Sequence, residues 1–497
     1  MIKKFFQNTA ILSATEILVS LRGLILIPIL TKMYGAVNTG IWAQVTIIVS
    51  MLSPLVILGL DSAFITCATG KGEVHLKKSF SSILFFIVSS GIVCIGLLFI
   101  FSRQFSILIL DSPENFFYII LAGFVILETV LLSICKLWYR VNENAKVYST
   151  VNIIQAFSTA ILAAVVAFFN GSIFELILII ALSESLLVLI ILIHIRKHWG
   201  FSSPDFSVLH ELLKFGIQVL PVAYAMWILT ASNRIFIGYF YNLAAVGIFS
   251  VAYLFGYMIM NLIFGPIWVM YPPKAAELFN QGKLGELNKL FNYSLKAALG
   301  LLIPATVGFS LLGTAIFAIF TSPEFSEGAK IVPFIALGFV FHVIGSYFVL
   351  SLGFVRKQIY GTLTIFAAAG LNIVLNILLI PHFGILGAAI ALCLSFMIQM
   401  ILEIWLGNKY LKFRFDWIFL GKSVFSTGVM GVAVLIVSGV FSGSFIISCC
   451  TGFITYALMM ICVRSVNQQE MKTLLEMLHC SDLKKYPFIC KFLGIND

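Results

Sequence analysis

Residues 6–30 read FQNTAILSATEILVSLRGLILIPIL, and this run decides the fold class because it is long and apolar enough to cross a lipid bilayer. A transmembrane helix needs about 20 predominantly apolar residues. The chain begins MIKKFFQ, which resembles the start of a signal peptide, but the run contains Glu16 and Arg22, and no small-residue cleavage site follows it. We therefore expect an uncleaved first transmembrane helix.

Further apolar runs fill the chain from end to end. They lie near residues 41–66, 79–101, 116–137, 148–169, 173–195, 214–240, 243–270, 297–320, 331–353, 359–380, 385–406, 420–441 and 444–463. Of the 497 residues, 61% are hydrophobic and 10% are charged, whereas soluble domains are about 25% charged. The composition predicts an all-α polytopic membrane protein with about 14 transmembrane helices and excludes a large soluble domain.

The basic residues indicate the topology, because cytoplasmic loops are enriched in Lys and Arg. Among the 31 Lys and Arg residues, the outer loops hold Lys32, Arg103 and Lys330, and the apolar runs contain Arg22 and Arg234. All the others, Lys136 among them, fall in segments predicted to be cytoplasmic. We expect both termini to be cytoplasmic. The net charge of +10 therefore indicates membrane topology and not nucleic-acid binding, which would need a basic face on a soluble fold.

The predicted organisation has four segments. They are a six-helix bundle at 1–198, a second at 199–408, two additional helices at 409–464 and a cytoplasmic tail at 465–497. Apolar residues at near-helical spacing among charges predict amphipathic helices on the inner membrane surface at 274–296 and 468–479. Packing against the cytoplasmic helix ends is the alternative. The nine cysteines show no C-x-x-C spacing, so we expect no disulfide, metal or cofactor.

A short motif occurs twice. Tyr34-GAVNT-Gly40-Ile-Trp42 returns as Tyr241-NLAAV-Gly247-Ile-Phe249, at a constant offset of 207 residues. Six helices separate the copies, and an even number keeps both in the same orientation. The halves are therefore predicted to be parallel repeats about an axis along the membrane normal.

Four stretches resemble a known family. They are 28–42 (PILTKMYGAVNTGIW), 138–156 (WYRVNENAKVYSTVNIIQA), 213–255 (LKFGIQVLPVAYAMWILTASNRIFIGYFYNLAAVGIFSVAYLF) and 383–392 (FGILGAAIAL). They are similar to the polysaccharide (O-antigen, Wzx-type) flippases of the multidrug/oligosaccharidyl-lipid/polysaccharide exporter superfamily. The resemblance implies two six-helix bundles around a central cavity, with two appended helices, and usually coupling to H⁺ or Na⁺. The family commonly has an acidic residue where this chain has Asn233.

Two arginines within apolar runs are the candidates for binding an anionic substrate. The resemblance implies a polyprenyl-pyrophosphate headgroup as that substrate, and the fork of an arginine side chain binds phosphate in a bidentate manner. Arg22 and Arg234 lie in the leading helices of the two predicted bundles. The alternative for Arg22 is a structural pair with a carboxylate of another helix. The alternative for Arg234 is an extension of its side chain to the membrane interface.

Carboxylates within the runs are the candidates for ion coupling, because a change in their burial would bind or release a proton. We predict this role for Glu16, Asp61 and Glu128. Glu16 is six residues from Arg22, so the two are poorly placed to pair. Glu128 and Glu184 are the mid-depth candidates for partners of Glu16 and Arg22. Glu184 is a weaker candidate for ion coupling, and Glu403 is weaker still, because a place at the lipid interface is its simple alternative.

Aromatic side chains in helices expected to line the cavity are candidate sugar contacts: Trp42, Tyr224, Trp227 and Tyr257. The apolar runs predict a multi-pass protein of the cell (inner) membrane. The resemblance implies that it moves a lipid-linked oligosaccharide unit from the cytoplasmic to the outer leaflet, by alternating access, for surface polysaccharide synthesis. Its expected partners are that lipid, membrane lipids, H⁺ or Na⁺ and other surface-polysaccharide assembly proteins. A multidrug antiporter of the same fold is the alternative. A polytopic glycan polymerase or glycosyltransferase is disfavoured, because the outer loops are short.

Overall fold

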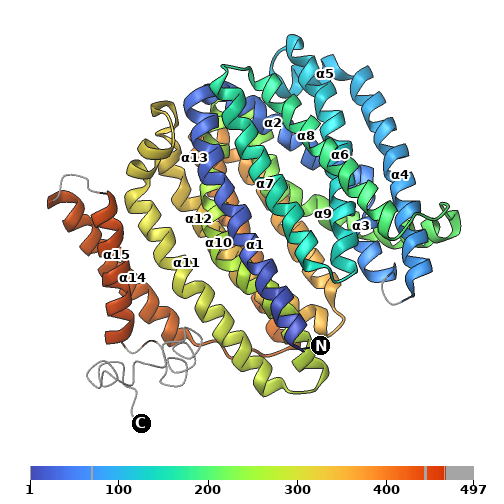
Figure 1. The fold of residues 1–497 in the computed structure, drawn as a ribbon. Helices are drawn as coiled ribbons and strands as arrows, with labels where there is room; N and C mark the ends of the chain where they lie inside the picture. Colours follow the sequence, from blue (N-terminus) through green and yellow to red (C-terminus); the bar gives the residue numbers. More distant parts are fainter. Residues whose placement is uncertain (1, 69–70, 441–444, 464, 466–497) are drawn as a thin grey trace. The chain divides into compact units, whose positions relative to one another are not determined.

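The chain is helical in a computed structural model that describes residues 2–68, 71–440, 445–463 and 465 (Figure 1). Within these ranges, 12 helices are long and apolar enough to cross a membrane. Two of them, Ile11–Ile57 and Gln358–Tyr410, each contain two of the predicted crossings. The prediction of about 14 transmembrane helices is therefore confirmed. The predicted helix at 468–479 lies outside the described residues.

The α-helices follow one another with short connections. In chain order they are α1 (Ile2–Ile29), α2 (Gly35–Ile57), α3 (Leu60–Ala63), α4 (Glu73–Ile100), α5 (Ser102–Leu110), α6 (Phe116–Val141), α7 (Ala145–Phe168), α8 (Ile173–His198), α9 (Phe206–Phe240), α10 (Leu243–Asn280), α11 (Leu284–Phe320), α12 (Gly328–Phe354), α13 (Gln358–Tyr410), α14 (Trp417–Val440) and α15 (Phe445–Cys462). They form two compact units. One contains Met1–Lys274 with Phe317–Leu411, and the other contains Ala275–Ile316 with the chain from Lys412 onward.

The two copies of the repeated motif pack against each other in the first unit. A Cβ added at Gly40 of α2 would overlap the carbonyl group of Leu243 in α10, and a Cβ added at Gly247 of α10 would overlap the carbonyl oxygen of Ala36 in α2. Ala36 and Leu243 are themselves equivalent positions of the repeat. The contact is thus reciprocal, as expected where two equivalent segments meet across a local two-fold axis.

One predicted helix has a break that the sequence analysis missed, and another break lies where the sequence predicted it. The run 41–66 was predicted as one helix, but α2 ends at Ile57, and Leu58 and Gly59 adopt left-handed conformations with φ of 48° and 69°. Close packing of Gly59 against the backbone of Gly216 in α9 accompanies this break. In α13, Gly384 has φ 58° and separates the two predicted crossings there.

The segment 274–296 is not one amphipathic helix lying on the membrane. It comprises the end of α10, a turn at residues 281–283 and the start of α11. In the second unit Leu287 and Phe291 are buried, and the Phe291 ring stacks on Phe413 at 4.2 Å. The alternative, packing of the helix ends, therefore holds for this part of the segment. Leu287 and Phe291 face protein because they belong to the start of α11, which continues into a membrane-spanning helix.

The second unit also has a polar contact that fixes α14. Lys296 Nζ lies 2.8 Å from Asp416 Oδ2. This hydrogen-bonded ion pair holds the pKa of Asp416 below its ordinary value. The Tyr456 hydroxyl of α15 donates a hydrogen bond to the Gly300 carbonyl of α11 at 2.6 Å. Contacts from α11 thus reach both C-terminal helices.

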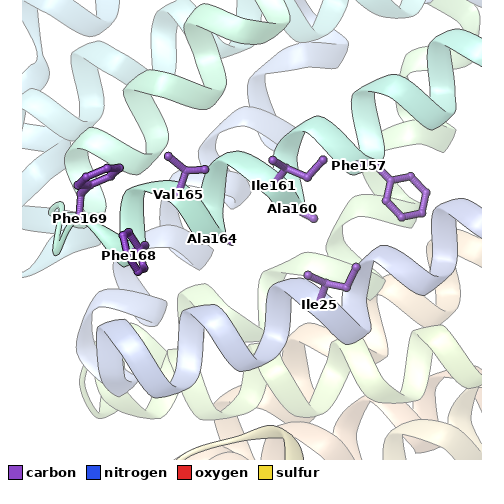
Figure 2. Close-up of a pocket in the computed structure, with 8 residues that line it drawn as sticks. All are labelled: Ile25, Phe157, Ala160, Ile161, Ala164, Val165, Phe168 and Phe169. Carbon is purple, nitrogen blue, oxygen red and sulfur yellow. The ribbon is translucent and has the colours of Figure 1, made fainter.

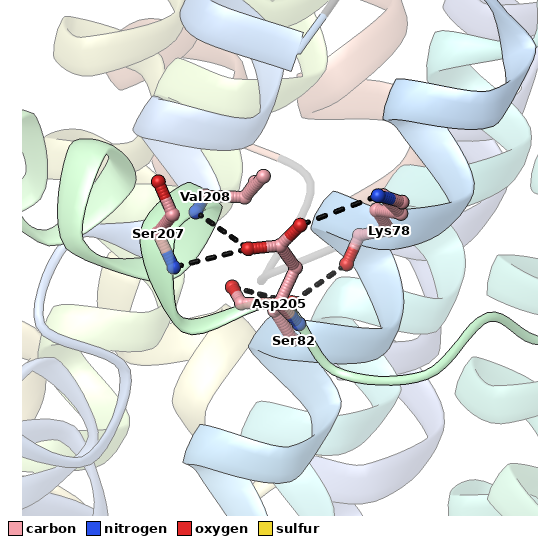
Figure 3. A network of polar contacts seen from close by, with 5 residues as sticks. All are labelled: Lys78, Ser82, Asp205, Ser207 and Val208. Atoms are coloured by element: carbon pink, nitrogen blue, oxygen red, sulfur yellow. Dashed lines mark hydrogen bonds and ion pairs between the residues drawn. The ribbon is translucent and has the colours of Figure 1, made fainter.

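The linker between α8 and α9 is held by a polar network around Asp205 (Figure 3). Asp205 Oδ1 accepts hydrogen bonds from the backbone N–H groups of Ser207 and Val208 and so caps the start of α9. Its Oδ2 lies 3.3 Å from Lys78 Nζ in α4, and its backbone N–H donates to the Ser82 hydroxyl at 2.8 Å. The hydrogen bonds from the Val208 N–H and from Lys78 hold the pKa of Asp205 below its ordinary value.

Candidate functional site

Arg22 lies half-buried on α1 among polar side chains from other helices. Glu184 of α8 and Tyr257 of α10 are close enough to interact with it electrostatically. Within the described chain, the Arg22 guanidinium forms no hydrogen bond or ion pair. The structure therefore places Glu184 near Arg22, as the sequence analysis considered, but does not join the two in an ion pair.

Lys136 is a second cation at this site, and the sequence analysis assigned it wrongly to a cytoplasmic segment. It lies half-buried within α6, and its Nζ donates to Asn152 Oδ1 at 3.1 Å and to Gln155 Oε1 at 2.9 Å. Gln155 Nε2 in turn donates to Glu184 Oε1 at 3.1 Å. The sequence did contain an indication that Lys136 lies within a helix, because this residue falls inside the apolar run 116–137.

The charged cluster consists of Glu16, Arg22, Lys136 and Glu184. Glu16, Arg22 and Glu184 all lie within electrostatic reach of the Lys136 ammonium group, and Tyr257 lies within reach of Glu16 and Arg22. The two positive and two negative formal charges of the cluster balance, but its two cations differ in their hydrogen-bond partners. Lys136 is held by two amide oxygens, whereas Arg22 keeps its donors unused among the described residues.

Arg234 of α9 is held by contacts with α9 and α10, apart from the charged cluster. Its Nε donates to the Ser250 hydroxyl at 3.0 Å, its Nη1 donates to the Thr230 carbonyl at 3.2 Å, and its guanidinium carbon lies 4.3 Å from the centre of the Tyr253 ring. These contacts turn Arg234 toward α10 and not toward the membrane interface. Tyr253 and Tyr257 are stacked, with ring centres 6.5 Å apart, so this tyrosine pair lies between Arg234 and the charged cluster.

The carboxylates predicted for ion coupling lie in different surroundings. Glu128 of α6 is 5% exposed; its Oε2 accepts a hydrogen bond from the Ser185 hydroxyl at 2.9 Å, and its Oε1 is buried without a partner among the described residues. Asp61 lies half-buried in α3, and in the described structure its carboxylate forms no hydrogen bond or ion pair. Of the three predicted carboxylates, Glu16 is the one in the charged cluster.

The Glu403 side chain faces protein and not lipid, contrary to the interface alternative considered from the sequence. It is 1% exposed and is enclosed by α12 and the first half of α13. The error arose because the position of a residue along a helix gives its depth but not the direction in which its side chain points.

The four aromatic candidates lie in three different surroundings. Tyr257 lies beside the charged cluster. The Tyr224 hydroxyl donates to the Met51 carbonyl at 2.8 Å, and Trp227 Nε1 donates to the Ser50 hydroxyl at 3.0 Å, so both side chains connect α9 with α2. Trp42 packs against the core formed by the N-terminal helices. A sugar-binding role for these four residues stays a prediction.

Asn233, where the resembling family commonly has an acid, belongs to a buried chain of neutral side chains. Asn376 Nδ2 donates to Asn233 Oδ1 at 2.8 Å and also lies 2.9 Å from Asn372 Oδ1. Asn372 Nδ2 donates to the Ser395 hydroxyl at 3.3 Å. This network connects α9 with both halves of α13 without a formal charge.

An apolar groove lies between α1 and α7 (Figure 2). It has a volume of about 480 Å³ and is lined by Ile25 of α1 with residues of the second half of α7, among them Phe157, Ile161 and Phe168. Ile25 follows Arg22 by three residues, about one helical turn. The groove thus provides apolar surface that begins on α1 about one turn from Arg22.

The fold is that of a known class of membrane transporters. The chain is similar to the lipid II flippase MurJ in its inward closed conformation, with 17% identity, coverage of 92% of this chain and 99% of that chain, and a TM-score of 0.74. It is also similar to an inward-facing multidrug resistance MATE family transporter, with 13% identity, coverage of 80% and 94%, and a TM-score of 0.65. The protein is thus a multi-pass membrane protein with the MurJ and MATE fold.

Residues 29–330 match the model of the polysaccharide biosynthesis protein family, and the chain belongs to this family. It is 28% identical over 207 residues to a probable flippase, AglR, of Haloferax volcanii, and 27% identical over 214 residues to an uncharacterised membrane protein of Methanocaldococcus jannaschii. These alignments cover 41% and 42% of this chain and span 43% and 41% of the respective relatives. The family predicted from the sequence is confirmed, and the prediction that the chain is a transporter and not an enzyme agrees with these matches.

Proposed function

We propose that this protein is a flippase that moves a polyprenyl-pyrophosphate-linked oligosaccharide from the cytoplasmic to the outer leaflet. The observation that carries the proposal is the unpaired Arg22 in the charged cluster, with an apolar groove that begins at Ile25, one helical turn farther along α1. Such a lipid has an anionic head and a long hydrocarbon chain, so its binding site must offer both kinds of surface.

The chemistry of the charged cluster suits a pyrophosphate. Arg22 has free donors in a planar fork that matches two phosphate oxygens. Lys136 adds a second positive charge, and Gln155 connects it to Glu184. Arrival of an anion would draw Arg22 and Lys136 toward it and leave Glu184 less well paired. Tyr257 and the other aromatic candidates would then contact sugars, with Arg234 positioned behind the tyrosine pair.

Contacts between the two halves of the chain support alternating access. On the side predicted to be outer, Lys32 Nζ donates to the Ile319 carbonyl at 2.6 Å, and the backbone N–H of Ala36 donates to Glu324 Oε2 at 2.9 Å. The crossing of Gly40 and Gly247 lies on the same side. We infer that these contacts close the outer side in this conformation and separate when the substrate leaves.

Coupling to H⁺ or Na⁺ is part of the proposal, with Glu16, Asp61 and Glu128 as the candidate groups. Glu128 supports it best, because a buried carboxyl oxygen without a hydrogen-bond donor favours the protonated form. The central cavity and the bundle boundaries at 198 and 408 stay predictions, as does assembly with other surface-polysaccharide proteins. The O-antigen pathway is the proposed destination of the glycan.

Export in cells tests the role of Arg22. Arg22→Ala is expected to abolish surface glycan export and to accumulate the lipid-linked intermediate on the cytoplasmic side, while the protein still reaches the membrane. The matched control is Arg103→Ala, because Arg103 is exposed at the start of α5. Normal export by Arg22→Ala would remove this residue from the mechanism. Export of small cationic drugs without any effect on the glycan would favour the antiporter alternative.

A further inference from the structure

The carboxyl group of Glu403 is enclosed between two helices. Its Oε1 accepts a hydrogen bond from Gln399 Nε2 at 2.9 Å and lies 3.4 Å from the Thr364 hydroxyl. Its Oε2 faces Gly345 of α12, where an added Cβ would overlap it. The absence of a side chain at Gly345 therefore provides the space that the carboxyl group occupies.

The available hydrogen-bond donors do not suit an ionised carboxylate. The Thr364 hydroxyl has one hydrogen, and it already donates to the Gly361 carbonyl at 2.7 Å. Gln399 thus supplies the one donor to Glu403 within the described structure, and Oε2 receives none. A buried carboxylate normally accepts several hydrogen bonds or pairs with a cation, because loss of hydration is strongly unfavourable for the charge.

The available acceptors suit a carboxylic acid. A proton on Glu403 Oε1 can donate to Thr364 Oγ1, whose lone pairs are free to accept it. Gln399 Oε1 is a further buried acceptor without a hydrogen-bond donor among the described residues, and rotation of this amide would present it to the acid. The protonated form of Glu403 satisfies groups that the ionised form leaves without partners.

No charged side chain compensates for Glu403. In the described chain no cation forms an ion pair with it, and no charged group contributes to its electrostatic surroundings. Titratable groups on the packed elements contact other residues. On α12, the His342 ring lies at a tilt to Phe396 with ring centres 5.0 Å apart, and Tyr347 packs on Tyr271. Tyr360 on the first half of α13 stacks on Tyr410, and Arg234 on α9 is held by Ser250 and Thr230. Lys330 and Lys409 lie near the ends of α12 and α13.

We propose that Glu403 is a proton-binding site, occupied in this conformation and emptied when α12 and α13 separate at Gly345 during transport. Glu403 precedes Tyr410, the end of α13 on the side predicted to be cytoplasmic, by seven residues, or about two helical turns. Water reaching it from that side would take up the proton and hydrate the carboxylate. Its role in the cycle rests on the proposed transport function, whereas its protonation in this conformation does not.

Infrared spectroscopy of the purified protein tests the protonation directly. The wild type is expected to show the carbonyl stretching band of a buried carboxylic acid at neutral pH, and Glu403→Gln is expected to remove one component of it. Glu128→Gln is the matched control and should remove a different component. Should Glu403→Gln fail to fold, Gln399→Leu must shift the frequency of the Glu403 component instead. An unchanged spectrum in these variants would overturn the proposal.

Transport in proteoliposomes tests the role in the cycle. A proton gradient is expected to accelerate movement of a lipid-linked oligosaccharide by the wild type and by Glu114→Gln, a substitution in an outer loop, whereas Glu403→Gln loses the acceleration. Retained acceleration in Glu403→Gln would overturn its role. Absence of any transport by the wild type would instead refute the proposed function, and the infrared result would still decide whether Glu403 holds a proton.

Discussion

At the scale of single residues, two buried groups show what the sequence does and does not reveal. Arg22 was identifiable because a charge within an apolar run is unfavourable unless it has a function. The hydrogen bonds from Lys136 to Asn152 and Gln155 could not be identified from the sequence, because those partners come from another helix. Sequence position indicates depth in the membrane, but hydrogen-bond partners depend on how the helices are rotated against each other.

Lys136 provides the first prediction at this scale. Lys136→Met removes the charge but keeps the length of the side chain, so it should weaken binding of the lipid-linked oligosaccharide by about 1.5–3 kcal/mol, the contribution of a hydrogen bond to a charged group. This corresponds to about tenfold to a hundredfold in Kd. Titration of the labelled lipid into detergent-solubilised protein measures it, with Arg103→Ala as the control. Unchanged affinity would place Lys136 outside the binding site.

Asp205 provides the second prediction at the scale of single residues. Because hydrogen bonds hold the pKa of Asp205 below its ordinary value of 3.8, its contribution to stability is present above that value and is lost as the pH falls through the lower folded-state pKa. The protection factors of the amides in residues 199–208, which compare exchange with its intrinsic rate at the same pH, should therefore fall on acidification below about pH 4 in the wild type. In Asp205→Asn, protection should already be low at neutral pH and should depend less on acid. Equal pH dependence in both proteins would show that the Lys78 contact does not hold the linker.

At the scale of elements, the repeated motif explains how α2 and α10 pack. The sequence predicted equivalent halves from one short motif that occurs twice, and the structure shows that the matched glycines lie against each other's helix. The break at Gly384 falls between the predicted runs 359–380 and 385–406 and was therefore predicted. The break at Leu58 was not, because the apolar residues around it continue the run 41–66 without interruption.

Substitution of these glycines tests the packing of α2 against α10. Gly40→Ala and Gly247→Ala each place a methyl group where a carbonyl lies, so each should destabilise this conformation by about 1–3 kcal/mol. Gly96→Ala in α4 is the control, because no atom lies within 4 Å of its added Cβ. It should stabilise the helix by about 0.5–1 kcal/mol. Thermal unfolding in detergent measures all three, and equal stability of Gly40→Ala and Gly96→Ala would refute the close contact.

At the scale of the whole molecule, the account combines a transporter fold with a binding surface for an amphiphilic anion. The number of crossings was predictable because the apolar runs are long and the breaks between them are short. The proximity of Arg22, Lys136 and Tyr257 was not predictable, because it depends on how α1, α6 and α10 pack against one another. Each half of the chain contributes to the surroundings of Arg22, since Glu184 comes from the first and Tyr257 from the second.

Reconstitution into lipid vesicles tests the central claim most directly. Purified protein, a fluorescent polyprenyl-pyrophosphate-linked oligosaccharide and a membrane-impermeant quencher report which leaflet holds the lipid. The account predicts that wild-type protein and Arg103→Ala equilibrate or pump the lipid between leaflets, and that Arg22→Ala does not. Movement at the same rate in vesicles with wild-type protein and in protein-free vesicles, or equal movement by wild type and Arg22→Ala, would contradict it.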